Sequence, residues 1–469
     1  MSALFRPPIR HTIGVLDRAL FAKTVPLAAA AVTDRKQIAE WRQKLQKEKT
    51  ILSVERLQAV VAHPDQLLAS QGARCLLLDP KVLPGVPDTW TALLRDGVEK
   101  KELGILPYDV SLDYTYWSYD DVMKCLLPQD PRDENDGFPS GFNQAGHVAH
   151  LNLRDEYLPY KKLIAEVLLD KNPGVRTVIN KVAGVGTHSE FRTFAYEVLA
   201  GDNDLNVTTR ENECTFRFDY GKVYWNSKLE GEHRRLVNLF KPGEVVCDVM
   251  AGIGPFAVPA GKKGVFVWAN DYNPESYRSL ASNIERNKVT QYVRAFNEDG
   301  RKFITNGVDA VYAASTSGVH AVVATKQVKE QQLKDGKKVQ KGGSGPPPKR
   351  IPVPSTVSHF VMNLPASAID FLPHYRGIYA GREQLFEPHT STKLPMVHTY
   401  CFAAKSEDDA PILDVCERLT AVLGVNIKVG DPEVTGEADV LEVRAVAPNK
   451  RMFCASFRIP PEVAFASRE

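Results

Sequence analysis

The chain has 469 residues, of which 59 are basic and 57 acidic, and 43% of its residues are hydrophobic. This length and composition predict two or three domains, and the balanced charge means that attraction to nucleic acid must come from local patches. No apolar run approaches the roughly 20 residues of a membrane span, so we expect a soluble protein without membrane contact. The cysteines lack C-x-x-C spacing, so we expect no metal site and no disulfide framework.

The N-terminal third predicts a separate domain. Residues 1–32 are basic, with Asp17 as their only carboxylate, which is similar to a mitochondrial transit peptide, although an ordinary strand and helix explains them better. Residues 36–105 alternate helical patterns with short apolar runs, and residues 128–147 concentrate Pro, Gly, Asp and Asn. We therefore predict a first domain over residues 1–135.

The remaining chain predicts two further domains. A helical pattern and several β-rich runs indicate a middle α+β domain over residues 136–225. Strand, turn and helix patterns then repeat over residues 226–469, which predicts an α/β fold with a doubly wound, mostly parallel sheet and a C-terminal antiparallel hairpin. Residues 326–350 hold eight Lys or Arg and two Asp or Glu, a net charge of 8 − 2 = +6, without apolar periodicity. We predict a disordered insertion there, and a solvated linker is a better interpretation than an RNA contact.

A glycine-rich turn opens the predicted catalytic domain. The apolar run that begins "VVCD" ends at Asp248, and Gly252 and Gly254 follow in "VMAGIGPF". A dinucleotide fingerprint needs a third glycine, and an acidic residue in the turn would repel a pyrophosphate. The acid would instead favour the amino group and sulfonium of S-adenosylmethionine. The pattern is similar to the first motif of class I methyltransferases.

Three later strands also end in polar residues. "VFVWAND" ends at Asp271, at the distance where an acidic residue accepts from ribose hydroxyls. "YVRAFNEDG" ends at Asp299 and Gly300, where a short carboxylate reaches an adenine amino group. "HFVMNLP" places Asn363 where methyltransferases that act on planar nitrogens carry a turn whose amide binds a flat base edge. Each aspartate alone is as well explained as a strand end or helix cap, but the three together favour a cofactor site.

These motifs together resemble the eukaryotic and archaeal tRNA (guanine-37-N1)-methyltransferase family, over residues 138–469 apart from the insertion. The resemblance implies N-terminal RNA-binding domains, a class I Rossmann-like catalytic domain, and methylation of the guanosine 3′ of the anticodon, which supports reading-frame maintenance. It implies S-adenosylmethionine as cofactor and tRNA as partner, bound at the anticodon stem-loop and outer corner. We expect a monomer that is cytoplasmic, with nuclear and mitochondrial matrix pools.

The resemblance also assigns site residues. It implies Glu232 as general base, Arg192 as the cation that stabilises guanine O6, and Asn363 as the residue that positions the base. Guanine N1 carries a proton and cannot attack a methyl group until that proton leaves, so a base with a raised pKa is required. The cofactor contacts implied are His233, Asp248, Gly252, Gly254, Asp271, Tyr272, Asp299, Gly300 and Asn363.

Other interpretations remain open. Residues 232–235 can be a solvated charged helix surface, and Arg192 can form a structural ion pair with Glu190 or Glu197. The aminocarboxypropyl transferase of the wybutosine pathway shares the fold and cofactor, and a catalytically silent tRNA-binding protein would keep the fold alone. A nicotinamide oxidoreductase is disfavoured by the missing glycine. Near the C-terminus, the cations Arg444, Lys450 and Arg451 lie beside apolar or aromatic residues, as in phosphate contacts.

Overall fold

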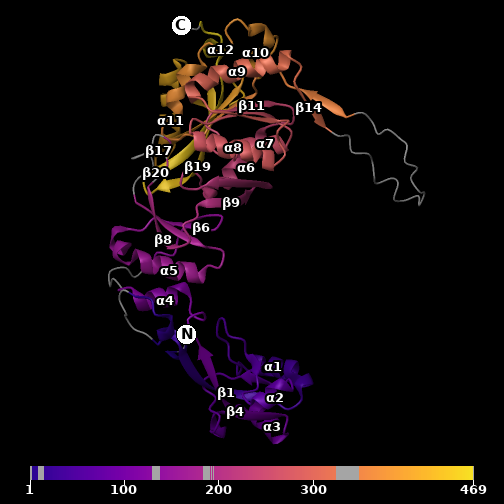
Figure 1. The fold of residues 1–469 in the computed structure, drawn as a ribbon, viewed down its shortest axis with the longest axis vertical. Coiled ribbons are helices and arrows are strands. Elements are labelled where there is room, and N and C mark those ends of the chain that lie inside the picture. Colours follow the sequence, from indigo (N-terminus) through magenta and orange to yellow (C-terminus); the bar gives the residue numbers. More distant parts are fainter. Residues whose placement is uncertain are drawn as a thin grey trace, which may run out of the picture. The chain divides into compact units, whose positions relative to one another are not determined.

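The computed structural model of the chain describes residues 3–8, 15–128, 138–182, 191, 193, 195–323 and 348–467. It contains two compact units (Figure 1). The first comprises Met1–Phe142, Leu151–Val178 and Val198–Gly201, and the second comprises Asn143–His150, Ile179–Glu197 and Asp202–Glu469. The three-domain division expected from the sequence stays a prediction.

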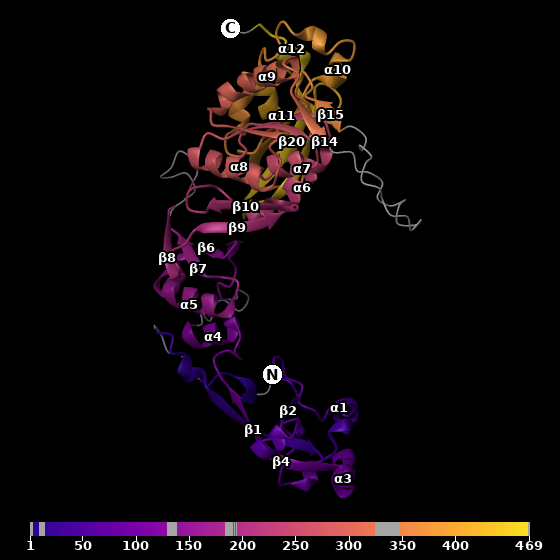
Figure 2. The same ribbon diagram turned by 45° about the vertical axis from the view of Figure 1, so that its right-hand side comes forward.

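The first unit is built on a four-stranded antiparallel sheet. Its strands, in spatial order, are β2 (Val60–Ala62), β3 (Arg74–Leu77), β1 (Lys23–Val32) and β4 (Leu103–Leu112). Helices α1 (Ile38–Lys47), α2 (Gln66–Ser70) and α3 (Ala92–Glu99) accompany it (Figures 1 and 2). Small residues on β1, including Ala28 and Ala30, leave room for Trp41 and Leu45 of α1 and Leu94 of α3 in one core cluster. The helices α4 (Tyr119–Leu126) and α5 (Lys161–Lys171) pack against each other.

Six shorter strands precede the large sheet of the second unit. Four form a sheet in the order β5 (Asn143–Ala145), β6 (Val148–Leu151), β7 (Thr177–Lys181) and β8 (Tyr196–Gly201). The other two, β9 (Asn206–Glu211) and β10 (Cys214–Asp219), form a hairpin whose two turn residues, Asn212 and Glu213, have positive φ.

An eight-stranded sheet forms the centre of the second unit. Its strands, in spatial order, are β13 (Val293–Phe296), β12 (Phe266–Asn270), β11 (Val245–Asp248), β16 (His359–Met362), β17 (Met396–Ala404), β20 (Lys450–Arg458), β19 (Glu437–Ala447) and β18 (Lys428–Val429). The pairs from β13 to β17 are parallel, whereas β20 runs antiparallel to both β17 and β19. The predicted mostly parallel sheet with a C-terminal antiparallel hairpin is therefore confirmed.

Helices cover both faces of this sheet, which explains why the strands are apolar without alternation. Figure 1 shows α9 (Gly300–Thr316) and α11 (Ala410–Leu423) on one face and α6 (Glu230–Leu239), α7 (Ala257–Lys262) and α8 (Pro274–Arg286) on the other. Phe303 and Ile304 of α9 and Val415 and Leu419 of α11 share one core cluster with the strands. Two short helices, α10 (Thr390–Lys393) and α12 (Pro461–Ala464), complete the unit.

The order of the strands reverses at β11. The chain passes from β11 to β12 and β13 on one side and returns to place β16 on the other side. In open α/β sheets a ligand site lies outside the carboxyl ends of the strands at such a reversal. The topology therefore directs the search for a site to the residues that follow these four strands.

The predicted C-terminal end of the disordered insertion is wrong. Lys349 and Arg350, placed in the disordered insertion, belong to β15 (Lys349–Pro352), which pairs antiparallel with β14 (His320–Val323). Lys349 and Arg350 pair through their backbone with β14, and composition alone does not predict this pairing. Residues 326–347 of the predicted insertion lie outside the described residues. Among the described residues, no helix has the length and apolar character needed to cross a membrane.

Candidate active site

A cavity of about 920 Å³ opens at the reversal of strand order beside β11. Gly252, Asp271, Asp299 and Asn363, which follow β11, β12, β13 and β16 respectively, all line it. Residues 19 to 111 positions apart therefore meet at one edge of the sheet, because parallel strands present their carboxyl ends together. The structure thus brings these four residues to one cavity, and the roles assigned to them stay predictions.

The turn after β11 depends on two glycines for different reasons. Gly252 has a φ of +56° and its N–H faces the carboxylate of Asp271, 2.7 Å from Oδ2. Gly254 has a φ of +97°, and a Cβ there would lie 2.8 Å from Cδ1 of Leu280 and 2.9 Å from Cγ2 of Val258. Gly252 lines the cavity, whereas Gly254, also predicted to contact the cofactor, does not. Gly254 instead permits close packing of the turn on α7 and α8.

The structure places Asp248 behind the cavity wall, and its expected cofactor contact stays a prediction. Asp248 is fully buried at the end of β11, is not in the cavity wall, and its carboxylate oxygens have no hydrogen-bond partner within the described ranges. Burial, and then the nearby Asp271, raises the pKa of Asp248 well above its usual value.

Backbone hydrogen bonds hold the carboxylate of Asp271 in the cavity wall. Its Oδ2 accepts the N–H of Gly252 at 2.7 Å and its Oδ1 accepts the N–H of Asn273 at 2.9 Å. Burial raises the pKa of Asp271 to about 6. The side chain of Ser276 also hydrogen-bonds to this carboxylate. A carboxylate has about four acceptor sites, so one remains for a ligand. Tyr272, the next residue, is half exposed and also lines the cavity.

Asp299 and Gly300 form the start of α9. Asp299 is the N-cap, and its side chain accepts the N–H of Arg301 at 2.8 Å. A Cβ on Gly300 would lie 3.1 Å from Cε1 of Phe371, another residue of the wall. That Cβ would also lie 3.1 Å from Cγ1 of Val249, so the glycine permits close packing of the helix start against Phe371 and Val249.

Asn270 positions the two acidic turns, and sequence reasoning missed it. Its amide donates to the carbonyls of Val249, at 3.1 Å, and Glu298, at 3.0 Å, and accepts the N–H of Glu298 at 2.8 Å. This buried side chain therefore joins the ends of β11 and β13 across the end of β12. The available signal was a polar residue that ends the apolar run "VFVWAN" just before Asp271.

The β9–β10 hairpin is attached to α8 by two asparagines. Asn283 accepts the N–H of Arg217 at 2.9 Å, and Asn287 accepts the N–H of Thr215 at 2.9 Å. The side chain of Asn283 also donates to the carbonyl of Ile253 in the glycine turn, at 3.2 Å. The hairpin and the turn are consequently fixed to one helix.

The predicted catalytic residues differ in their placement. Asn363 follows β16 and lines the cavity, and within the described residues its amide has no side-chain hydrogen bond. Glu232, on the first turn of α6, is buried and lies outside the cavity wall, where it contacts Arg235 and Tyr400. Arg192 lies outside the described residues. The structure thus brings Asn363, but not the Glu232 carboxylate, to the cavity surface.

His233 forms part of the wall beside Glu232. Its Nδ1 lies 2.5 Å from Oε1 of Glu211, and its ring meets Phe256 edge-on with 4.7 Å between ring centroids. The predicted contact residue is therefore at the cavity, and a buried carboxylate on β9 fixes its orientation.

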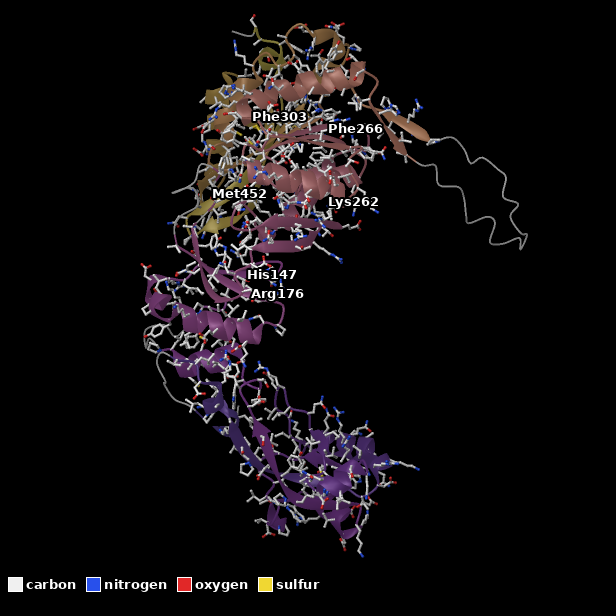
Figure 3. All side chains as sticks on the ribbon, viewed as in Figure 1. His147, Arg176, Lys262, Phe266, Phe303 and Met452 are labelled. Atoms are coloured by element: carbon white, nitrogen blue, oxygen red, sulfur yellow. The ribbon has the colours of Figure 1, made fainter. Side chains whose placement is uncertain are left out.

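The C-terminal hairpin supplies cations to the same cavity. Arg444 of β19 and Lys450 of β20 line it together with Met452, which Figure 3 labels. The Nζ atom of Lys450 lies 4.2 Å from the ring centroid of Phe402, another lining residue. Arg451 instead forms an ion pair with Glu442 and does not line the cavity. Two of the three predicted cations are thus at the site.

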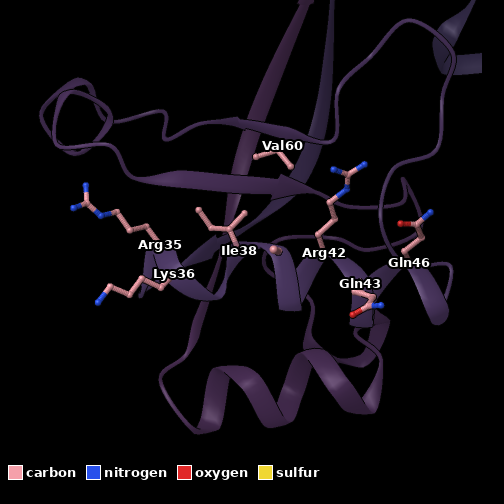
Figure 4. Close-up of a pocket in the computed structure, with 8 residues that line it drawn as sticks. Arg35, Lys36, Ile38, Arg42, Gln43, Gln46 and Val60 are labelled. Carbon is pink, nitrogen blue, oxygen red and sulfur yellow. The ribbon is translucent and has the colours of Figure 1, made fainter. Parts of the chain in front are cut away.

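A second basic feature lies on the first unit. Figure 4 shows a pocket of about 460 Å³ beside α1, and its charged lining residues are Arg35, Lys36 and Arg42. No acidic side chain is among its lining residues, all of which lie within residues 35–60. This pocket holds none of the residues predicted for catalysis.

Family models and similar known proteins both indicate the same family. Residues 207–330 match the model of the TRM5/TYW2 methyltransferase domain, and residues 123–204 match that of the TYW2 N-terminal domain. A tRNA (guanine(37)-N(1))-methyltransferase of Neurospora crassa is 58% identical over 467 residues, covering 99% of this chain and 96% of that protein. The protein of that name from Schizosaccharomyces pombe is 42% identical, covering 96% of this chain and 95% of the relative.

Solved structures support the fold. A structure of aTrm5 in complex with tRNALeu matches with a TM-score of 0.56 at 17% identity, covering 92% of this chain and 99% of that one. Trm5b from Pyrococcus abyssi matches with a TM-score of 0.53 at 20% identity and the same coverage of both chains. At these sequence identities the two structures show a shared fold and nothing more.

Proposed function

The chain belongs to the tRNA (guanine(37)-N(1))-methyltransferase family, and from this premise we propose that it transfers a methyl group from S-adenosylmethionine to N1 of guanosine 37 in tRNA. The observation that carries the proposal is the convergence of Asp271, Asp299 and Asn363 on one cavity. Two carboxylates suit the hydroxyl and amino donors of a nucleoside, and an amide suits the edge of a second base. The proposed consequence in the cell is maintenance of the reading frame.

The residues present fit this cofactor. Asp271 keeps one acceptor site for a ribose hydroxyl, because two backbone N–H groups and the Ser276 side chain occupy the others. Asp299 would accept from the adenine amino group, and Phe371 in the cavity wall would lie beside the ring. His233, Gly252 and Tyr272 would line the remainder. When bound, S-adenosylmethionine supplies an electrophilic methyl group on a sulfonium.

The side chains of this chain would prepare the guanine. Glu232 would accept the N1 proton, which makes the N1 electron pair available. Negative charge would then collect on O6, and we retain Arg192 for its stabilisation on the basis of the family resemblance. Asn363 would hold the base edge through its amide, so that much of the acceleration comes from orientation.

Two cationic surfaces would bind the tRNA. Arg444 and Lys450, in the cavity wall, would contact phosphates near the target nucleotide. Arg35, Lys36 and Arg42 of the first unit would contact phosphates elsewhere, in accord with the outer-corner recognition implied for the N-terminal domain. The salt dependence of tRNA affinity would report on both surfaces.

The related aminocarboxypropyl transfer remains the second candidate because residues 123–204 match the TYW2 N-terminal domain. We favour methyl transfer because relatives with the methyltransferase name cover nearly the whole chain. The test uses two unmodified tRNA transcripts that differ only in G or A at position 37, followed by nucleoside analysis. We expect 1-methylguanosine from the G transcript alone; methylation of both transcripts or of neither would contradict the proposal.

A further inference from the structure

Three cross-strand neighbours form a row on one face of the large sheet. Phe402 of β17 pairs with Met452 of β20, and Met452 pairs with Arg444 of β19. Directly paired residues of antiparallel strands project from the same face of a sheet. All three residues line the cavity, and Figure 3 labels Met452. The row, which spans about 10 Å across three adjacent strands, is therefore one continuous part of the cavity wall.

The row starts beside the turn that carries Asn363. The N–H of Phe402 donates to the carbonyl of Pro365, two residues after Asn363, at 3.1 Å. Asn363 and Pro365 both line the cavity. Because the strands follow in the order β16, β17, β20 and β19, the row leads from this turn toward Arg444. A base held at Asn363 would therefore have Phe402 as its nearest neighbour in the row.

A β-bulge in β19 brings Arg444 to this face. Leu441 of β19 pairs with Cys454 of β20. Unbroken alternation from that pair would set Val443 opposite Met452 and turn Arg444 to the other face of the sheet. The register shift just before Arg444 pairs Arg444 with Met452 instead. Bulges of this kind re-aim a side chain, so the hairpin is built to place this cation in the cavity wall.

Two cations on the cavity face of the hairpin have no acidic partner. Lys450 lines the cavity, and its Nζ lies 4.2 Å from the ring centroid of Phe402. Within the part of the chain that the structure describes, neither Lys450 nor Arg444 forms an ion pair. On the opposite face, by contrast, Arg451 pairs with Glu442. The cavity face thus combines an aromatic ring and a thioether with two positive charges that remain for a ligand.

A nucleotide next to the target base has the chemistry that this row suits. An enzyme that acts on a base in a stacked strand must take that base out of the stack, which removes a stacking partner from each neighbouring base. An aromatic ring gives a neighbouring base a new packing partner, and cations beside the ring contact its phosphate. Phe402 and Met452 supply the apolar surface, and Arg444 and Lys450 supply the charge. The row also adjoins the Asn363 turn, as a site for an adjoining nucleotide must.

We propose that this row is a second nucleotide subsite, which binds the nucleotide adjacent to guanosine 37 in the tRNA. Its base packs against Phe402 and Met452, and its phosphate contacts Arg444 and Lys450. This inference rests on the proposed function of the cavity. The nucleotides at positions 36 and 38 offer the same chemistry, and the experiment distinguishes them.

The test removes one neighbouring base at a time from the RNA. Single-turnover methylation of guanosine 37 is measured below enzyme saturation on transcripts with an abasic nucleotide at position 36 or at position 38. With the wild-type protein, loss of the base that occupies the subsite should lower the rate by about 5- to 150-fold. The same loss should cost Phe402→Leu less, by about threefold or more, whereas Phe402→Tyr keeps the ring and should keep the full dependence.

A matched control separates the subsite from general effects of losing an aromatic ring. Phe465→Leu changes a partly buried residue outside the cavity wall, whose ring centroid lies 5.8 Å from that of Phe386, and it should keep the wild-type base dependence. Thermal unfolding of each variant checks that it is folded, and the comparison of transcripts with the wild-type protein holds whether or not Phe402→Leu folds.

Three results would overturn the subsite while 1-methylguanosine still forms from the intact transcript. Neither base removal slows the wild-type protein, or each slows Phe402→Leu as much as it slows wild type, or Phe465→Leu loses the dependence as far as Phe402→Leu does. Absence of 1-methylguanosine from the intact transcript with the wild-type protein would overturn the proposed function, and this inference with it.

Discussion

Replacing Asp271 with asparagine should weaken cofactor binding and abolish its pH dependence. The carboxylate receives the N–H groups of Gly252 and Asn273 and the side chain of Ser276, and leaves one acceptor site to the ligand. An amide has a single acceptor atom, so at least one of these four hydrogen bonds is lost and an NH2 group faces a former donor. A hydrogen bond to a charged group contributes about 1.5–3 kcal/mol, which corresponds to a rise in Kd of about 10- to 100-fold.

The pH dependence follows from the same carboxylate. Burial raises the pKa of Asp271 to about 6, so the ionised form that would accept a ribose hydroxyl prevails above that pH. Wild-type affinity should therefore be full above about pH 6 and fall by up to about tenfold per unit as pH drops below it. The neutral side chain of Asp271→Asn should give a nearly flat profile.

Equilibrium titration of S-adenosylmethionine from pH 5 to 8 measures both effects, and Trp225 in the cavity wall provides an intrinsic fluorescence signal. Asp309→Asn is a matched control, because Asp309 pairs with Arg382 and lies outside the cavity. An unchanged affinity in Asp271→Asn, or an equal loss in Asp309→Asn, would refute the reasoning.

The other predictions concern packing and charge. Gly254→Ala should lower the free energy of unfolding by about 1–3 kcal/mol in denaturant titrations, more than Gly252→Ala, because its φ is +97° and its Cβ would meet a side chain at 2.8 Å. Asn270→Ala should raise the cofactor Kd by about tenfold or more in equilibrium binding, because buried carbonyl and N–H groups lose their partner. Arg444→Ala should raise the KM for tRNA and lower the slope of log KM against log salt concentration by about one. Arg451→Ala is the control and should have a weaker effect, because Arg451 pairs with Glu442 and does not line the cavity. An equal slope change in both would show that cavity placement does not matter.

The location of the site was predictable because it depends on topology. Asp271, Asp299 and Asn363 each end a short apolar run, and the parallel arrangement of such runs brings their ends together. The sheet itself follows from repeated strand and helix patterns, and only the final antiparallel hairpin departs from them. Periodicity thus identified both the scaffold and the three polar residues at its edge.

The internal supports of the site were not predictable in this way. Tyr400 reaches Glu232 across 168 sequence positions, and nothing local to either residue indicates the contact. Asp248 has the sequence position of a ligand-binding acid, yet its burial is decided by elements packed around β11. The role of Asn270 depends on the distance between two turns that it joins. Such roles are set by tertiary packing, which motif spacing does not encode.

The central claim is that this cavity directs methyl transfer to N1 of guanosine 37. A dual-label reaction tests it most directly: S-adenosylmethionine carries one isotope in its methyl group and another in its carboxyl carbon, and the recovered tRNA is digested to nucleosides. We predict that only the methyl label enters the tRNA, that it elutes as 1-methylguanosine, and that Glu232→Gln lowers this signal by orders of magnitude. Carboxyl label in the nucleoside would instead identify aminocarboxypropyl transfer and contradict the account.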